Sequence, residues 1–382
     1  MSSDSELLQY FETSLPHSLE LLRQMVEIES HSMDKTGVDA LADFMTREFA
    51  ARGARTSILR EPVRGNLLEC SWGADPSRKP ILIIGHLDTV WPRGSLAARP
   101  FRVEQGRAYG PGVFDMKAGL VQMVFALRVL NDLGLQPSLP PVVFINSDEE
   151  IGSRDSREHI RQLAAGAARA FVLEPSFGPS GALKTARKGV GRFTVKVKGR
   201  ASHSGLDPDQ GASAILEISH QIQRLFALND RERGISVNVG TIDGGLRANV
   251  IAPEVRADVD ARVLYGEDMA PVERAILGLE AVGEGVTVEV AGGFGRPPLE
   301  RTERNVALWR AAQQAAGELG IEIGEATVGG ASDGNITSQY TATLDGLGPV
   351  GDGAHAAHEQ VVKSQMPERS ALLALLLLAP CS

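Results

Sequence analysis

The stretch ILIIGHLD, residues 81–88, decides the fold, because four consecutive apolar residues run directly into polar ones. Such a run is typical of a strand that is buried on both faces of a parallel sheet. Two similar runs follow, VVFI at residues 142–145 and AFVL at residues 170–173, and a helix-like segment at residues 117–133 lies between the first two. Strands alternating with helices predict an α/β fold with a mostly parallel sheet.

Each of these runs ends in side chains that can bind a metal. ILII leads to His86 and Asp88, VVFI leads to Glu149 and Glu150, and AFVL leads to Glu174. In open α/β sheets, ligands bind beyond the carboxyl ends of the strands. We therefore expect these side chains to meet at one edge of the sheet.

Two more candidates come from loops. Asp115 lies in GPGVFDMK before the helix-like segment, and His355 lies in a glycine-rich loop after the last apolar run. Imidazoles and carboxylates without thiolates suit Zn²⁺, Co²⁺ or Mn²⁺, and two metals about 3.5–4 Å apart need a bridging carboxylate. The sequence therefore predicts a two-metal site with five ligands: His86, Asp115, Glu150, Glu174 and His355.

The neighbours of these ligands suggest further roles. Asp88 could accept the second imidazole N–H of His86, as supporting carboxylates do at metal sites. Glu149 and Glu150 cannot both face one metal, so one is expected to be a ligand and the other a general base. On spacing alone, His358 competes with His355 as a ligand.

The pattern changes after Gly181. Residues 184–296 contain strand-like segments in which apolar and polar positions alternate, in the order strand, helix, strand, strand, helix, strand. This order predicts a ferredoxin-like α+β insert whose sheet has one solvent-exposed face. We expect residues 1–183 and 297–382 to form the catalytic domain and residues 184–296 to form the insert.

Composition limits the function. The net charge of −9 offers no basic stripe for nucleic acid. The two cysteines, Cys70 and Cys381, supply neither a disulfide framework nor a metal site. We see no secretory signal, and the apolar run at residues 371–380 is too short to cross a membrane, so we expect a buried final helix and a cytoplasmic protein with no membrane partner.

The order of motifs along nearly the whole chain resembles one family, the zinc metallopeptidases that include glutamate carboxypeptidase, aminoacylase, acetylornithine deacetylase and succinyl-diaminopimelate desuccinylase. The motifs are GHLDTVW (85–91), GPGVFDMKAG (110–119), NSDEEIGS (146–153), LEPS (173–176), RKGVGRFTVKVKGRASHSG (187–205), NVIAPEVRADVDAR (249–262), GGASDGN (329–335) and GAHAAHE (353–359). Glu in LEPS is more similar to the glutamate carboxypeptidase branch.

The resemblance assigns the roles at the metals. It implies that His86 and Glu174 bind one zinc, that Glu150 and His355 bind the other, and that Asp115 bridges them. It further implies that Asp88 supports His86, that Glu149 is the base, and that the Asp115–Met116 peptide bond is cis. The family pattern places a Glu four residues after its histidine ligand, which here is Glu359 and favours His355 over His358.

The same resemblance makes the insert a lid that also forms a homodimer. His203 would then reach the partner's active site, and Arg262 with Asn249 would bind the substrate carboxylate. The glycine-rich loop would contact the substrate through Gly330, Ser332, Asp333 and Asn335.

The expected enzyme is a dizinc hydrolase that cleaves the amide bond of a small peptide at its C-terminal amino acid. The alternatives are an N-acyl-amino-acid deacylase of the same family and a non-catalytic binding protein. A two-metal phosphoesterase would need more cationic groups near the metals than the sequence places there.

Overall fold

The computed structural model describes residues 3–73, 75 and 77–380, which divide into two compact units. The first unit contains the described residues up to Thr185, Arg301–Thr327 and the described residues from Ser332 onward. The second contains Ala186–Glu300 and also Val328–Ala331, a short segment that the sequence pattern places in the first unit. The catalytic and lid roles of the units stay predictions.

A six-stranded sheet forms the centre of the first unit. Its strand order is β1 (Arg55–Leu59), β2 (Leu67–Ser71), β6 (Pro141–Asn146), β3 (Ile81–His86), β7 (Arg169–Val172) and β14 (Ala342–Leu344). The last four run parallel, whereas β1 and β2 pair antiparallel at one edge. The predicted mostly parallel α/β sheet is therefore confirmed.

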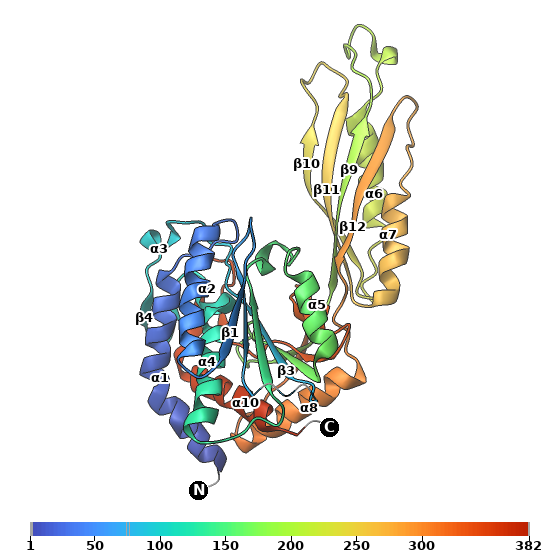
Figure 1. Cartoon of the computed structure of the whole chain (residues 1–382). Coiled ribbons are helices and arrows are strands. Elements are labelled where there is room, and N and C mark those ends of the chain that lie inside the picture. The colour runs from blue at the N-terminus through green and yellow to red at the C-terminus, as the bar shows by residue number, and fades with distance from the viewer. Residues whose placement is uncertain (1–2, 74, 76, 381–382) are drawn as a thin grey trace. The chain divides into compact units, whose positions relative to one another are not determined.

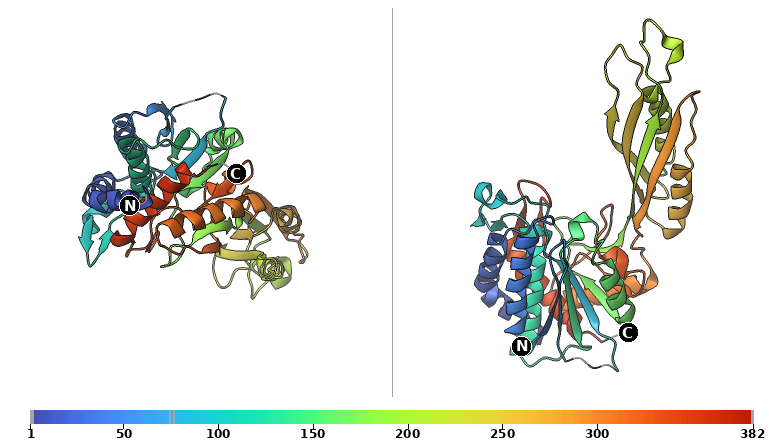
Figure 2. Two further views of the ribbon diagram at one scale, coloured as in Figure 1. Left: turned by 90° about the horizontal axis from the view of Figure 1, so that it is seen from below. Right: turned by 45° about the horizontal axis from the view of Figure 1, so that its top comes forward.

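Helices cover both faces of this sheet (Figures 1 and 2). One face carries α1 (Ser3–Glu27), α2 (Lys35–Ala50), α4 (Ala118–Asp132), α8 (Glu303–Glu318) and α10 (Met366–Leu378), and the other carries α5 (Arg157–Gly166) and α9 (Gly334–Thr337). Strand β3 shows why its sequence is apolar throughout, since Ile81 and Ile83 pack in the first core while Leu82 and Ile84 pack in the second.

The final helix, α10, is buried along most of its length, as the apolar run predicts. Among the described helices, none combines the length and the apolar character that a membrane crossing requires. Cys70 is a buried free thiol, whereas Cys381 lies outside the described residues.

Two smaller sheets complete the first unit. One has the order β15 (Gly351–Asp352), β16 (Gln360–Val362), β5 (Arg107–Tyr109) and β4 (Arg102–Glu104), and the other pairs β8 (Leu183–Arg187) with β13 (Glu325–Val328). The four-stranded sheet matters for the site, because the loop between β15 and β16 carries His355.

The second unit is an antiparallel α+β domain, as expected. Its elements are β9 (Gly189–Lys198), α6 (Ala214–Phe226), β10 (Ser236–Gly244), β11 (Glu254–Val263), α7 (Met269–Leu277) and β12 (Thr287–Arg296), and the sheet order is β10-β11-β9-β12. Phe193, Val195 and Val197 alternate along β9 and pack in the unit's own core with residues of both helices. The opposite face of the sheet is polar.

The segment Val328–Ala331 is tied to the second unit by three hydrogen bonds. Lys188 N donates to Val328 O over 3.0 Å, Arg262 Nη1 donates to Gly329 O over 2.7 Å, and Arg187 Nη1 donates to Gly330 O over 3.2 Å. The first two glycines of GGASDGN are therefore held by arginine side chains rather than by the central sheet.

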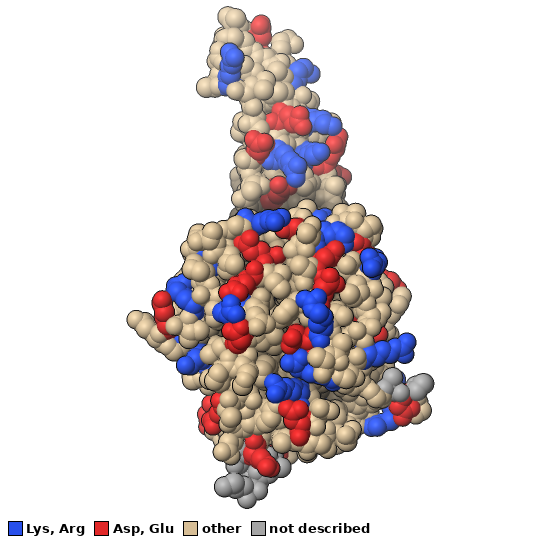
Figure 3. Space-filling view, turned by 60° about the vertical axis from the view of Figure 1, so that its left-hand side comes forward, with Lys and Arg blue, Asp and Glu red and all other residues tan. Residues whose placement is uncertain are grey.

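Surface charges of both signs are interspersed on the face shown in Figure 3. Lys and Arg side chains lie beside Asp and Glu side chains across this view, and neither sign gathers into a broad patch. This distribution agrees with the moderate negative net charge of the chain.

Candidate metal centre

Three neighbouring parallel strands bring acidic and imidazole side chains to one edge of the central sheet. His86 is the last residue of β3, Glu149 and Glu150 open the short helix η2 (Glu149–Ile151) after β6, and Glu174 follows β7. Because β6, β3 and β7 are adjacent, these side chains meet as the strand ends predict.

The other two predicted ligands arrive from outside the sheet. Asp115 lies in η1 (Val113–Lys117), where its φ and ψ of −113° and 98° are not helical, and the Asp115–Met116 peptide bond is cis, as the resemblance implies. His355 does not directly follow β14. It lies in the loop between β15 and β16, in the small four-stranded sheet of the first unit, and its φ is 62°.

The carboxylate of Asp115 lies between the two imidazoles. Its Oδ1 is 3.2 Å from His86 Nε2, and its Oδ2 is 3.3 Å from His355 Nε2. Each imidazole faces a second carboxylate as well, since His86 Nε2 is 3.6 Å from Glu174 Oε1 and His355 Nε2 is 3.0 Å from Glu150 Oε2. The result is two nitrogen–oxygen clusters that share one carboxylate.

This donor set fits a pair of divalent metal ions. Glu150 Oε1 is buried and has no hydrogen-bond partner among the described residues, which is costly for a carboxylate unless a cation lies nearby. Imidazole nitrogen with carboxylate oxygen suits Zn²⁺, Co²⁺ or Mn²⁺, and a shared carboxylate suits two of them. The residues of the site therefore match the metals that the sequence predicts.

Electrostatics point the same way. Burial, which is the largest influence, raises the pKa of Glu150, and the negative charge of Asp115 adds to the rise. Hydrogen bonds to Asp115 and Glu150 raise the pKa of His355 to about 10. Burial alone would raise the pKa of Asp115, yet the hydrogen bonds from His355 and His86 lower it. The closely spaced carboxylates thus favour a positive charge beside them, which a protonated imidazole or a bound cation can supply.

The geometry places both adjacent glutamates among the candidate metal ligands. Ligand atoms of His86, Glu149 and Glu174 lie within 4.8 Å of one another, and so do those of His86, Asp115 and Glu150. Contact with His355 distinguishes Glu150 from Glu149. The division into ligand and base stays a prediction.

Asp88 is fully buried beside these residues and contacts the end of β3 and the segment after β6. Its carboxylate accepts hydrogen bonds from Glu149 N and Glu150 N, each over 3.2 Å, and from Ser32 Oγ over 2.7 Å. The nearest acceptor of His86 Nδ1 is the main-chain oxygen of Asp88 at 2.9 Å, whereas the carboxylate lies 3.5 Å away. Asp88 thus orients the glutamates through its side chain and His86 chiefly through its backbone.

Two neighbours of the ligands were not assigned a role from the sequence. Ser32 reaches Asp88 from a segment that is distant in the chain, and no local pattern indicates this contact. Glu359 is buried and accepts hydrogen bonds from the backbone around Asp115. His358 is exposed, and its Nε2 lies 3.8 Å from Oδ2 of Asp352.

Three predicted substrate residues of the glycine-rich loop are buried in the first unit. Ser332 donates to Asp345, Asn335 accepts from Ser332 N over 2.9 Å, and Asp333 accepts from Asn146 over 2.7 Å. These contacts hold the start of α9 and favour a structural role. Contact of these side chains with substrate stays a prediction.

The remaining predicted residues lie in the second unit. His203 is exposed and forms a β-bridge with Val250, next to the exposed Asn249. His203 Nδ1 accepts hydrogen bonds from Gly205 N and Leu206 N over 3.1 and 3.2 Å. An acceptor at Nδ1 leaves the proton of a neutral imidazole on Nε2, so His203 can donate from Nε2.

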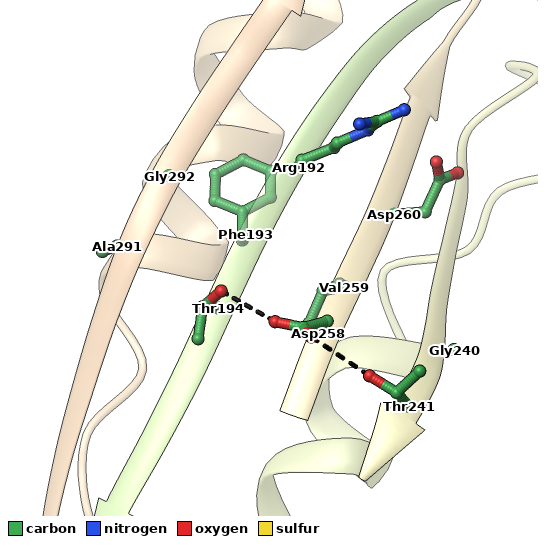
Figure 4. Close-up of a pocket in the computed structure, with 10 residues that line it drawn as sticks. All are labelled: Arg192, Phe193, Thr194, Gly240, Thr241, Asp258, Val259, Asp260, Ala291 and Gly292. Atoms are coloured by element: carbon green, nitrogen blue, oxygen red, sulfur yellow. Dashed lines mark hydrogen bonds between the residues drawn. The ribbon is translucent and has the colours of Figure 1, made fainter. Parts of the chain in front are cut away.

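Arg262 is already engaged in this structure. Its Nε and Nη2 donate to the carboxylate of Asp260 over 2.8 and 3.2 Å, and its Nη1 donates to Gly329 O. Asp260 also lines a hollow of about 610 Å³ on the polar face of the second unit's sheet, where Asp258 accepts hydrogen bonds from Thr194 and Thr241 (Figure 4). Neither cluster of possible metal ligands among the described residues lies in this unit.

Comparison with known proteins agrees with this architecture. The model of the family described as "Peptidase family M20/M25/M40" matches residues 82–379. Carboxypeptidase G2 of Pseudomonas sp. (strain RS-16) is 29% identical over 388 residues, which cover 98% of this chain and 92% of that protein. Acetylornithine deacetylase of Myxococcus xanthus is 29% identical over 255 residues, which cover 63% of this chain and 64% of that protein.

A solved structure has the same fold. The tripeptidase of Staphylococcus aureus superposes with a TM-score of 0.80 at 21% identity, covering 95% of this chain and 97% of that one. At this level of identity, the likeness concerns the fold alone.

Proposed function

The chain belongs to peptidase family M20/M25/M40, a family of hydrolases, and from this premise we propose that it is a dizinc enzyme that cleaves the amide bond to a C-terminal amino acid. One observation carries the proposal most directly. The Asp115 carboxylate presents one oxygen to His86 and the other to His355, which is the arrangement that a metal pair needs.

His86 and Glu174 would hold one ion, Glu150 and His355 would hold the other, and Asp115 would contact both. Bound divalent ions polarise a substrate carbonyl and lower the pKa of water to about 7. Zn²⁺ is the metal proposed here, and Co²⁺ or Mn²⁺ could take the same donors.

Glu149 is the proposed general base. Its backbone is held by Asp88, and its carboxylate lies close to His86 and Glu174. In the proposed cycle, Glu149 accepts a proton from the attacking water and then gives it to the nitrogen of the leaving amino acid. General acid–base catalysis of this kind contributes about 10²–10⁴-fold to a rate.

His203 is proposed to steady the carbonyl oxygen as negative charge develops there. The donor would be Nε2–H, because Nδ1 is occupied by two backbone N–H groups. Following the family resemblance, this histidine would come from a second copy of the chain.

A homodimer has a candidate surface on the second unit. Strand β10 is an edge strand, and exposed apolar side chains lie on it, after it and on α6, which packs against β10. These are Ile215, Leu216, Ile242 and Leu246. Unpaired edges and apolar patches of this kind mark surfaces for association.

Arg262 and Asn249 are the proposed binding residues for the substrate carboxylate. A guanidinium fork suits a carboxylate because two parallel hydrogen bonds form. Asp260 now occupies that fork, so a substrate carboxylate would have to share or replace this partner. Gly330 contributes only its backbone, whose oxygen accepts from Arg187.

A second candidate within the family is an N-acyl-amino-acid deacylase, which the 29% identity to an acetylornithine deacetylase supports. Both reactions hydrolyse an amide and release an amino acid with a free carboxylate, and they differ in the acyl group, which is an aminoacyl or peptidyl group for a carboxypeptidase and a simple acyl group for a deacylase.

The test is hydrolysis of a panel of dipeptides, N-acyl glutamates and other N-acyl amino acids by protein whose zinc content is measured in parallel. We expect about two metal ions per chain and turnover of substrates with a free carboxylate on the leaving amino acid. Turnover of N-acyl amino acids with simple acyl groups, without turnover of the dipeptides, would favour the deacylase. Fully metallated protein that hydrolyses no amide in the panel would refute the enzyme and favour a binding protein.

A further inference from the structure

Glu359 is a buried carboxylate that binds four N–H groups. Its Oε2 accepts from Trp91 Nε1 over 2.6 Å and from Gly112 N over 2.9 Å, and its Oε1 accepts from Phe114 N over 2.9 Å and from Asp115 N over 3.1 Å. The residue is only 4% exposed. Such a set of donors is expected for an ionised carboxylate that holds a segment of backbone in place.

The segment that it holds leads to the shared carboxylate of the site. Gly112 has a φ of 73°, and Asp115 departs from helical geometry. The helical hydrogen bonds of this stretch run from Lys117 N to Gly112 O and from Ala118 N to Val113 O, so they do not use the N–H groups of Gly112, Phe114 and Asp115. Buried backbone N–H groups need acceptors, and the carboxylate of Glu359 is the acceptor for three such groups in this stretch. The backbone of Asp115 is thus anchored by a side chain from another part of the chain.

Glu359 also belongs to the turn that carries His355. Glu359 N donates to Ala356 O over 3.0 Å, which closes this turn. A single carboxylate therefore joins the loop of one predicted metal ligand to the loop of another.

We propose that Glu359 is a positioning residue that sets the affinity of the chain for its metal pair by fixing Asp115 relative to His355. This inference rests on the proposed function, because it requires the metals. It does not place Glu359 among the groups that touch metal or substrate.

A buried carboxylate could instead serve stability alone, and the chain offers a matched control. Glu217, in the second unit, is 1% exposed and accepts hydrogen bonds from Val282 N over 3.0 Å and Gly283 N over 2.8 Å. It resembles Glu359 in burial and in binding backbone N–H groups, yet no proposed ligand contacts it. Glu217→Gln should therefore lower stability without changing metal affinity.

The experiment measures zinc affinity of the full chain by competition with a chromophoric chelator, together with the thermal midpoint of the metal-free protein. We expect Glu359→Gln to bind zinc about 10–100-fold more weakly, the range typical when a partner behind the ligands is lost. Glu217→Gln should keep wild-type zinc affinity.

A folded Glu359→Gln protein with wild-type zinc affinity would overturn the inference, and so would an equal loss of affinity in Glu217→Gln. If Glu359→Gln does not fold, Trp91→Phe decides, because it removes one donor and keeps an aromatic ring. A few-fold loss of zinc affinity in Trp91→Phe supports the inference, and unchanged affinity overturns it. Wild-type protein that binds no zinc would reject the proposed function itself, and with it this inference.

Discussion

Gly119 sits where the helix behind Asp115 meets the strand end that carries Glu174. A Cβ at this position would lie 2.3 Å from Leu173 O and 3.3 Å from Leu173 Cβ. Ordinary contacts begin near 3.4 Å, so in Gly119→Ala the start of α4 and the end of β7 would have to separate by about 1 Å. This movement would pull two predicted ligand-bearing segments apart.

The magnitude follows from two opposing effects. Overpacking of this kind costs about 1–3 kcal/mol, and replacing glycine by alanine within a helix recovers about 0.5–1 kcal/mol. We expect Gly119→Ala to lower the free energy of unfolding by up to about 2.5 kcal/mol and to weaken zinc binding.

The control is a second helical glycine in the same unit. Gly317 in α8 has no atom within 4 Å of the place where a Cβ would lie, so Gly317→Ala should be neutral or stabilising by up to about 1 kcal/mol. Urea unfolding of the metal-free proteins, with zinc titrations alongside, compares the two. Gly119→Ala that is as stable as Gly317→Ala would refute the close approach of α4 to Leu173.

Three further predictions address the base, the buried thiol and the dimer. Glu149→Gln should retain two zinc ions per chain while kcat falls about 10²–10⁴-fold, and full activity would reject the assigned base. Burial raises the pKa of Cys70 to about 12, above the value of 9.0 expected in the unfolded chain, so its contribution to stability is present below pH 9 and is lost as the pH rises toward 12. The stability of wild type relative to Cys70→Ala should therefore fall between pH 9 and 12, and parallel pH profiles in denaturant unfolding would contradict this. The double variant Ile215→Glu and Leu216→Glu should be monomeric by light scattering, keep its zinc and lose activity, whereas an intact dimer would place the interface elsewhere.

The parts of the fold that could be predicted are those with a strong local signal. Residues 81–84 are buried on both faces of the sheet, and a continuous apolar run in the sequence indicates this burial directly. The end of such a strand also predicts where His86 and Glu174 lie, because neighbouring parallel strands end at one edge. Period-two alternation likewise indicates the half-buried strand β9.

The rest depends on contacts between distant segments, which leave no periodic trace. His355 reaches the site from the small sheet that contains β15 and β16 rather than from the end of β14. Asp88 supports His86 mainly through its backbone oxygen, which any residue could supply. Ser332 and Asn335 lie in a glycine-rich stretch that is typical of an exposed loop, yet both are fully buried. Tertiary hydrogen bonds decide these positions, and composition does not reveal them.

The return of Val328–Ala331 to the second unit bears on how the protein can be divided. Cutting the chain on either side of residues 186–300 would yield a fragment in which Arg187 and Arg262 lose the carbonyl groups of Gly330 and Gly329. The remaining piece would keep this tetrapeptide without the arginines that bind it. Domain exchange between relatives should therefore transfer both segments together, since the second unit is built from two separate stretches of chain rather than from one simple insertion.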